Sequence, residues 1–171
     1  MNTAAGAERA SLIKSITLRG VREADLPIFF KMQTDPAANK MAAFTAIDPH
    51  DEAVFSARWS RILADQTIVA RTILCGEDVV GNIASFLRGQ EREVTYWLVK
   101  EYWGRGITST ALSLFLSEMT LRPLFGRAAK DNLASVRVLE KCGFTDCRQE
   151  RGFANARGCE IEEVVLELRE P

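Results

Sequence analysis

The sequence predicts a layered domain of the α/β or α+β class, in which helices cover a mixed sheet. Its 171 residues suit one compact core, and 47% of them are hydrophobic, which is enough to fill that core. Strand-like segments alternate with segments of helical periodicity, in the order strand, two helices, three strands, helix, strand, helix and two strands. Hairpin turns join some strands and helices join others, so we expect both antiparallel and parallel neighbours.

The amino-terminal half begins with a strand at residues 16–21 and continues with two helical regions. The first region spans residues 24–40, with Asp25 and Pro27 in its first turn, where acidic residues and proline are favoured. The second spans residues 51–64. Three strands follow, separated by glycine-containing turns, at residues 66–75, 79–87 and 93–99.

The carboxyl-terminal half alternates helices with strands. A helix of about residues 104–120 precedes a short strand at 123–129. A second helix over 132–141 stops before Gly143, a residue suited to the left-handed position that ends many helices. Two strands, at 144–153 and 160–168, close the chain around a turn.

The charge balance and the apolar pattern exclude several kinds of partner. The 22 basic side chains nearly cancel the 23 acidic ones, so bulk electrostatics predicts no nucleic-acid partner and no anionic membrane surface. No apolar run approaches the roughly 20 residues of a membrane span. Residues 1–13 lack the apolar core of a signal peptide, so we expect a flexible extension there and a single domain over 14–171.

The four cysteines show no metal-binding pattern. Cys75, Cys142, Cys147 and Cys159 lack C-x-x-C spacing, and His50 is the single histidine that could join them. We therefore expect no metal site. Thiols without an export signal favour a reducing, cytoplasmic location with most of the sulfur buried.

The most informative segment is a turn between a predicted strand and a predicted helix, Trp103-Gly104-Arg105-Gly106-Ile107-Thr108. Backbone N–H groups at a helix start have no acceptor within the helix, and the helix dipole is positive there. The turn is therefore suited to an anion, and a phosphate is the commonest one. The alternative is that its two glycines only permit a tight turn.

A second informative segment runs from Asn132 to Phe144. Asn132 is a good N-cap, and Ser135 lies one turn later on about the same helix face. By itself this pattern is also that of an ordinary capped amphipathic helix.

Together the two segments resemble the GNAT acetyltransferase superfamily. The turn at 103–108 is similar to its acetyl-CoA pyrophosphate loop, and residues 132–144 are similar to its later helix, N-x-x-S-x-x-x-L-E-K-x-G-F. Tyr96-Trp97-Leu98 and the run from Leu139 to Phe144 most resemble the ribosomal-protein-alanine N-acetyltransferase branch. The resemblance covers residues 16–170 and implies an α+β fold with a mostly antiparallel, splayed sheet flanked by about four helices.

The resemblance also implies acetyl-CoA as cosubstrate, without a metal. Its pantetheine arm would lie between the splayed strands and pair with the backbone of Trp97, Leu98 and Val99. Asn132 would face that arm. The pyrophosphate would bind to a set of residues at the helix start, namely Gly104, Arg105, Gly106, Ile107 and Thr108. The chain departs from the family at both ends of this loop, where it has Trp103 and Thr108 instead of Gln or Arg and Gly or Ala.

The implied reaction is direct attack of an amine on the thioester in a ternary complex, which needs a base and an acid. Leu139 occupies the position of the family's usual tyrosine acid. The resemblance to the ribosomal-protein branch, in which a serine of the N-x-x-S motif has the acid role, implies Ser135 as the acid; the alternative is a hydroxyl satisfied by the helix backbone. Glu93 is the candidate base, unless strand parity turns its side chain to solvent. Tyr96 and Ser85 are further candidates that would shape the acceptor pocket.

The acceptor is a protein N-terminus or a small-molecule amine. Phe44 and Phe153 are candidates to line its groove, and Arg151 and Arg157 would favour an acidic acceptor unless they only solvate a hairpin tip. We expect His50 to be a plain loop residue. Two other functions remain open: a CoA-binding sensor or scaffold without turnover, and a phosphate- or nucleotide-binding domain unrelated to acyl transfer. The sequence leaves open whether the chain is a monomer or a homodimer.

Overall fold

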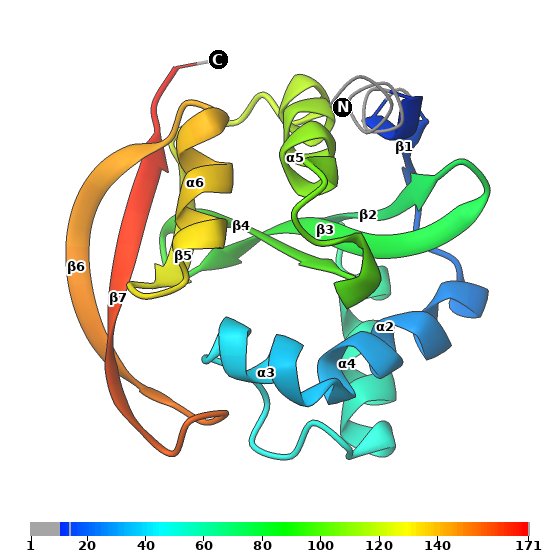
Figure 1. Ribbon diagram of the computed structural model, residues 1–171, viewed down its shortest axis with the longest axis horizontal. Coiled ribbons are helices and arrows are strands. Elements are labelled where there is room, and N and C mark those ends of the chain that lie inside the picture. The colour runs from blue at the N-terminus through cyan, green and yellow to red at the C-terminus, as the bar shows by residue number, and fades with distance from the viewer. Residues whose placement is uncertain (1–10, 14, 171) are drawn as a thin grey trace, which may run out of the picture.

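The computed structural model describes residues 11–13 and 15–170. In that part of the chain, seven strands form one sheet in the order β1-β2-β3-β4-β5-β7-β6 (Figure 1). Neighbouring strands are antiparallel except for β4 and β5, which are parallel. The predicted mixed α/β class and the strand order along the chain are confirmed. The strands are β1 (Ile16–Gly20), β2 (Val69–Cys75), β3 (Asp78–Arg88), β4 (Glu91–Leu98), β5 (Leu124–Ala129), β6 (Thr145–Ala154) and β7 (Cys159–Leu168).

The helical region predicted at residues 24–40 is divided into separate helices, which corrects the expectation of one. Asp35 has an extended backbone and its side chain accepts a hydrogen bond from the amide of Ala38, so a new helix starts at Pro36. The other predicted helices form, one with its expected cap Asn132 and one capped by Asp51. The helices are η1 (Glu23–Asp25), α2 (Leu26–Thr34), α3 (Pro36–Ala42), α4 (Glu52–Ala64), η2 (Lys100–Tyr102), α5 (Ile107–Glu118) and α6 (Leu133–Lys141).

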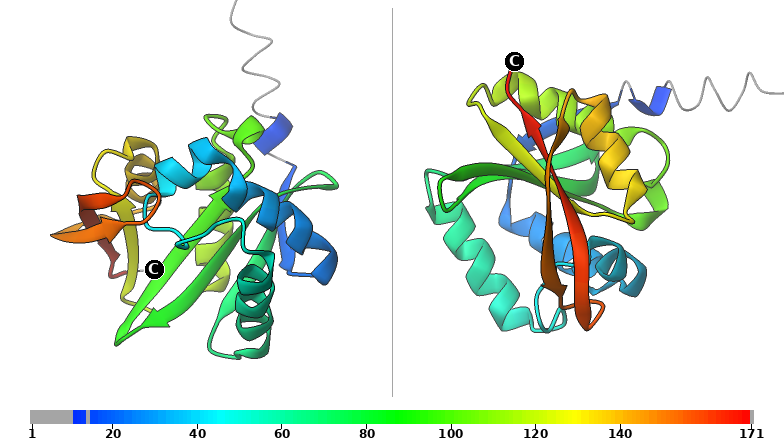
Figure 2. Two further views of the ribbon diagram at one scale, coloured as in Figure 1. Left: turned by 90° about the horizontal axis from the view of Figure 1, so that it is seen from below. Right: turned by 90° about the vertical axis from the view of Figure 1, so that its left-hand side faces the viewer.

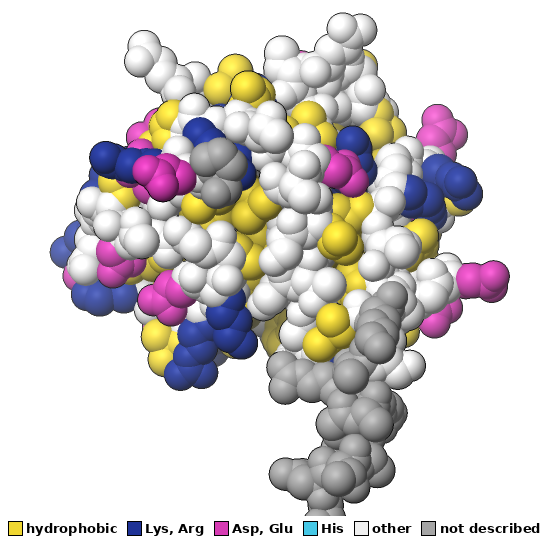
Figure 3. Space-filling model, turned by 90° about the horizontal axis from the view of Figure 1, so that it is seen from above, with side chains coloured by type: hydrophobic (Ala, Val, Ile, Leu, Met, Phe, Trp, Pro, Cys, Tyr) yellow, Lys and Arg dark blue, Asp and Glu magenta, His cyan; other side chains and the backbone are white. Residues whose placement is uncertain are grey.

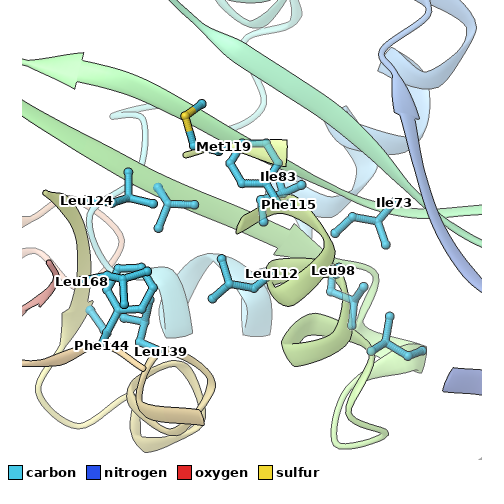
Figure 4. Close-up of a cluster of buried hydrophobic side chains, with 14 of the residues drawn as sticks. Ile73, Ile83, Leu98, Leu112, Phe115, Met119, Leu124, Leu139, Phe144 and Leu168 are labelled. Atoms are coloured by element: carbon cyan, nitrogen blue, oxygen red, sulfur yellow. The ribbon is translucent and has the colours of Figure 1, made fainter. Parts of the chain in front are cut away.

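The two faces of the sheet bury different cores. Helices α5 and α6 cover one face, and their apolar side chains pack with those of the strands around Phe115, which is fully buried (Figure 4). Helices α2 and α4 cover the other face with a smaller aromatic cluster (Figures 1 and 2). In that cluster the rings of Phe29 and Trp59 lie 5.0 Å apart. The sheet is therefore the middle layer of three.

The sheet parts between β4 and β5. These strands pair at two positions only, Glu93 with Phe125 and Val94 with Gly126, and each continues beyond the pairing without the other. Gly126 also lets α6 approach, because a Cβ there would lie 2.5 Å from a methyl group of Leu139. The splay implied by the family resemblance is thus present at the centre of the sheet.

Several sequence expectations concern the surface and the ends of the chain. Residues 1–10 of the proposed extension lie outside the described residues, and Ser15 donates from its amide and its hydroxyl to the Leu12 carbonyl. Cys147 and Cys159 are exposed, which corrects the expectation of mostly buried sulfur. Figure 3 shows charged side chains of both signs spread over the face near α5 and α6. No helix in the described part of the chain combines the length and apolarity that crossing a bilayer requires.

Gly81 allows β3 and β4 to lie in close contact. β3 has a bulge opposite Ile73 and Leu74, and Gly81 follows it. A Cβ at Gly81 would lie 2.2 Å from the carbonyl oxygen of Trp97, which is backbone and cannot rotate away. We expect Gly81→Ala to lower the free energy of unfolding by about 1–3 kcal/mol, measured by denaturant titration.

Gly20→Ala is the matched control, since a Cβ at Gly20 meets no atom within 4 Å. Equal midpoints for Gly81→Ala and the natural chain would contradict the close approach of the two strands.

Asp25 ties the first strand to the second. Its carboxylate accepts from both terminal nitrogens of Arg19 at 2.7 Å and from the Thr72 hydroxyl at 2.6 Å. Burial alone would raise the pKa of Asp25, but these donors and the Arg22 amide outweigh it and lower the pKa from 3.8 to about 2.

Because folding lowers this pKa, the carboxylate stabilises the fold at a pH above about 3.8 and loses that effect as the pH falls through about 2. The contribution is roughly 2 kcal/mol. We expect Asp25→Asn to lower stability at neutral pH and to flatten its decline in this acid range, as measured by denaturation at several pH values. Glu52→Gln, at an exposed position of α4, should leave the decline unchanged.

Candidate active site

A groove of about 840 Å³ follows the parting of the sheet. Its walls come from both sides of the sheet: α2, α3 and α4 on one side, the starts of α5 and α6 on the other, and β3, β4 and β5 between them. The groove thus joins the helix start that the sequence singled out to the aromatic cluster on the opposite face.

The start of α5 lies in this groove. Gly104 and Gly106 have positive φ angles of 72° and 85°, which turn the chain sharply into the helix. Thr110 makes the first helical hydrogen bond, to the Gly106 carbonyl at 3.1 Å, and Gly106 supplies no capping side chain. The amides of the first three residues of α5 therefore have no acceptor in the helix, and they are suited to an anion.

The predicted phosphate-loop residues divide into two groups. Gly104, Gly106, Ile107 and Thr108 line the groove. Arg105 is outside its lining, and its guanidinium lies 5.6 Å from the ring centre of Tyr102. Arg105 is therefore expected to contribute to phosphate binding through the backbone of the turn or through the charge of its side chain.

Trp103 has a role that the sequence analysis missed. Its indole nitrogen donates to the Leu98 carbonyl at 2.9 Å, so the turn is fastened to the end of β4. The sequence signal for this role was the tryptophan itself, which departs from the family at this position. Its hydrogen-bond partner was not predictable, because that depends on how the turn folds back.

The backbone of β4 presents alternate residues to the gap. The Val99 amide donates to the Val80 carbonyl at 2.8 Å, so in this antiparallel register Val99 and Trp97 bond toward β3. Tyr96 and Leu98 consequently direct their backbone groups away from β3, toward the parting. Of Trp97, Leu98 and Val99, the three residues predicted to pair with a pantetheine arm, Leu98 directs its backbone toward the parting, whereas Trp97 and Val99 bond toward β3.

Ser135 and Tyr96 meet across the parting. The two hydroxyl oxygens lie 2.8 Å apart, and the Tyr96 hydroxyl also lies 3.2 Å from the Ser135 carbonyl. Burial raises the pKa of Tyr96, against an opposing effect of its bond with Ser135, so the phenol holds its proton at neutral pH. Leu139 is in the core and 1% exposed, so this helix offers no tyrosine of its own there.

Asn132 holds the start of α6 and its neighbour α3. Its side-chain oxygen accepts from the Ser135 amide at 3.1 Å, and its side-chain nitrogen donates to the Met41 carbonyl at 3.2 Å. The same residue lines the groove. Its cap therefore fixes the position of Ser135 relative to Tyr96.

Glu93 is buried at the inner end of the parting, where β4 and β5 still pair, and it lines the groove. Its Oε1 accepts from Nε of Arg127 at 2.5 Å and lies 3.7 Å from Arg88. Oε2 makes no hydrogen bond to another of the described residues.

Arg127 on β5 contacts carboxylates from three other strands. It contacts Glu91 at 3.0 Å, Glu150 at 2.5 Å and Glu163 at 3.3 Å, in addition to Glu93. Burial alone would lower the pKa of Arg127, but these contacts raise it. Burial raises the pKa of Glu163, which Arg127 offsets only in part. This network makes one wall of the groove, and no local sequence signal indicates it.

The remaining candidate residues differ in whether they line the groove. Phe44 lines the groove, whereas His50 and Phe153 are exposed outside its lining. Arg157 is paired with Asp131 at 2.6 Å and Arg151 lines a separate surface pocket, so neither reaches the groove. Within the described residues, no three His, Cys, Asp or Glu side chains are grouped as metal ligands would be.

A scan of protein families matches residues 15–145 to the acetyltransferase (GNAT) domain. A search of curated proteins found no match. Among solved structures, a chain titled as a probable acetyltransferase is 24% identical, with a TM-score of 0.70, covering 91% of this chain and 93% of that one.

Two further solved structures contain coenzyme A. RimL, a ribosomal-protein α-N-acetyltransferase, is 18% identical with a TM-score of 0.76, covering 91% of this chain and 94% of that one. Spermidine N-acetyltransferase from Vibrio cholerae, in complex with CoA and spermine, is 16% identical with a TM-score of 0.75, covering 90% of this chain and 96% of that one. At these identities the likeness establishes the fold.

The fold and the family match define an acetyltransferase. The chain belongs to the acetyltransferase (GNAT) domain family, and its class is that of acetyl-CoA-dependent N-acetyltransferases. The resemblance inferred from residues 103–108 and 132–144 is thereby confirmed.

Proposed function

We propose that the groove binds acetyl-CoA on the α5 side and an amine on the α2–α4 side, and that the acetyl group passes directly between them. The observation that carries this proposal is the continuous groove from the α5 start, through the parting, to the aromatic face. The pyrophosphate lies at Gly104, Gly106, Ile107 and Thr108, where the helix amides are open. The arm lies along β4 and pairs with the backbone amide of Leu98 and the backbone groups of Tyr96, while the Leu98 carbonyl stays on the Trp103 indole.

We assign the acid role to Ser135 and a positioning role to Tyr96. The amine attacks the thioester carbonyl, the C–S bond breaks, and the CoA thiolate takes a proton from the Ser135 hydroxyl. Ser135 regains a proton from the attacking nitrogen, which loses it on becoming the amide, so the products are an amide and a thiol. Tyr96 lies 2.8 Å from Ser135 Oγ, where either hydroxyl can donate, and donation by Tyr96 would leave the serine proton free to face the sulfur. The raised pKa of Tyr96 argues that it keeps its proton and positions Ser135.

We assign the base role to Glu93. Its Oε2 takes a proton from the ammonium of the acceptor, directly or through a water, while Oε1 stays on Arg127. That ion pair fixes the carboxylate at the inner end of the parting, next to the acceptor side of the groove.

The acceptor is a primary amine of a protein N-terminus or a small molecule. Solved relatives by fold include proteins titled for both kinds of acceptor, a ribosomal protein and spermidine. A second candidate function is a CoA sensor without turnover, which Leu139 in the place of a tyrosine favours. Binding of CoA with no transfer to any amine would identify that function.

We expect Gly104→Ala to weaken CoA binding at least about tenfold, because the loop must distort away from φ 72° to accept a side chain. Isothermal titration measures the affinity. Gly89→Ala is a matched control, since Gly89 also has a positive φ and open space around it but lies in a distant hairpin turn. Should the natural chain fail to bind CoA at millimolar concentration, the proposed function is wrong.

We expect Ser135→Ala to slow turnover at least about tenfold, which is about 1.4 kcal/mol at the barrier. The CoA affinity should change less than about twofold, since the serine acts on the leaving group. Tyr96→Phe should give a smaller loss in the same assay of thiol release. Ser113→Ala on α5, outside the groove, is the control. An unchanged rate for Ser135→Ala would remove this residue from the mechanism.

A further inference from the structure

The groove is lined by more basic than acidic side chains. The acidic residues are already engaged: Glu93 and Glu163 contact Arg127, and Asp65 accepts from the amide and hydroxyl of Thr67 at 2.8 and 2.7 Å. The basic residues of the lining are Arg58, Arg61, Arg88, Arg127, Arg137 and Lys141.

Arg58 differs from three arginines of the sheet that are paired. Arg19, Arg71 and Arg127 each contact a carboxylate, whereas Arg58 has neither an ion pair nor a hydrogen bond within the part of the chain that the structure describes. Arg58 is exposed and forms part of the groove wall. Partial desolvation there and repulsion from Arg61 lower the pKa of Arg58, and a guanidinium nevertheless stays charged.

Arg61 does not neutralise the positive charge of Arg58. Its Nε donates weakly to the Ala57 carbonyl at 3.4 Å, and it too contacts no carboxylate among the described residues. Two cations three positions apart on a helix repel each other, so an anion between them would be stabilised by both.

The position of Arg58 separates it from the phosphate-binding end of the groove. It lies on α4 between Phe55 and Trp59, which belong to the aromatic core on the α2–α4 face, whereas Ile107 at the start of α5 belongs to the core of the other face. An anion at Arg58 is therefore not the cofactor's pyrophosphate.

We propose that Arg58, supported by Arg61, binds a carboxylate of the acceptor, so that the acceptor is an amine that also carries a negative charge. This inference rests on the proposed function for the location of the amine. The ammonium lies toward Glu93, the apolar part of the acceptor contacts the aromatic wall, and the carboxylate meets the planar guanidinium, which pairs well with that group. The source is an acidic peptide N-terminus or a small amino acid.

Two pairs of amines test this. One pair is the peptide Ser-Glu-Glu-Phe amide and its partner Ser-Gln-Gln-Phe amide, and the other is β-alanine and β-alaninamide. Binding to the CoA-loaded protein is measured by calorimetry, and transfer from acetyl-CoA is measured on the same four amines. The pair that shows a preference identifies the acceptor as a peptide or as a small amine.

We expect the carboxylate member of one pair to bind at least about tenfold more tightly than its amide partner. Arg58→Gln should reduce this preference to within about twofold, and Arg58→Lys should retain part of it. Lys31→Gln is the control, because it removes the same charge from exposed α2 outside the groove lining. Thermal midpoints and CoA affinity confirm that each variant is folded.

The outcomes separate the two proposals. Equal binding within both pairs, no binding of any of the four amines, or a preference that survives in Arg58→Gln overturns the carboxylate site, even if acetyl transfer occurs. A preference that depends on Arg58 but comes with no acetyl transfer supports the carboxylate site and overturns the catalytic function.

Discussion

The parting of β4 from β5 is the constraint on which the rest of the site depends. Two paired positions hold the strands together, and beyond them each strand has an open edge of backbone groups inside the protein. Such groups need partners, so the opening is suited to a polar, extended ligand. Gly126 places α6 over the same point, which brings Ser135 to Tyr96, and the turn at 103–106 ends beside the open edge.

The Arg127 network keeps the second wall in place. Glutamates from β4, β6 and β7 converge on one guanidinium, so strands that are distant in the sequence hold a fixed spacing around the inner end of the groove. A buried network of this kind is costly unless each member is paired. Here Arg127 pairs with one oxygen of Glu93 and with the other glutamates of the network.

Local patterns predicted the elements well, because caps and turns act over a few residues. Asp51 and Asn132 start helices as expected, and Gly104 and Gly106 make the predicted turn. The break at Asp35 was readable from an Asp-Pro pair, but the helical periodicity around it masked the signal. The contacts of Tyr96, Trp103 and Arg127 were not predictable, because each depends on which distant strand or helix lies alongside. Strand register likewise decides which residues of β4 face the opening.

The short β4–β5 pairing has a consequence for the order of events in catalysis. The sheet consists of two blocks, β1–β4 and β5–β7, and these carry different residues of the groove: Tyr96 and Glu93 on the first, Arg127 and Glu163 on the second. A donor molecule lying in the seam would bridge the blocks with hydrogen bonds that the sheet itself lacks. The surface that binds the acceptor would then be complete only after the donor has bound, which favours an ordered mechanism in which acetyl-CoA binds first.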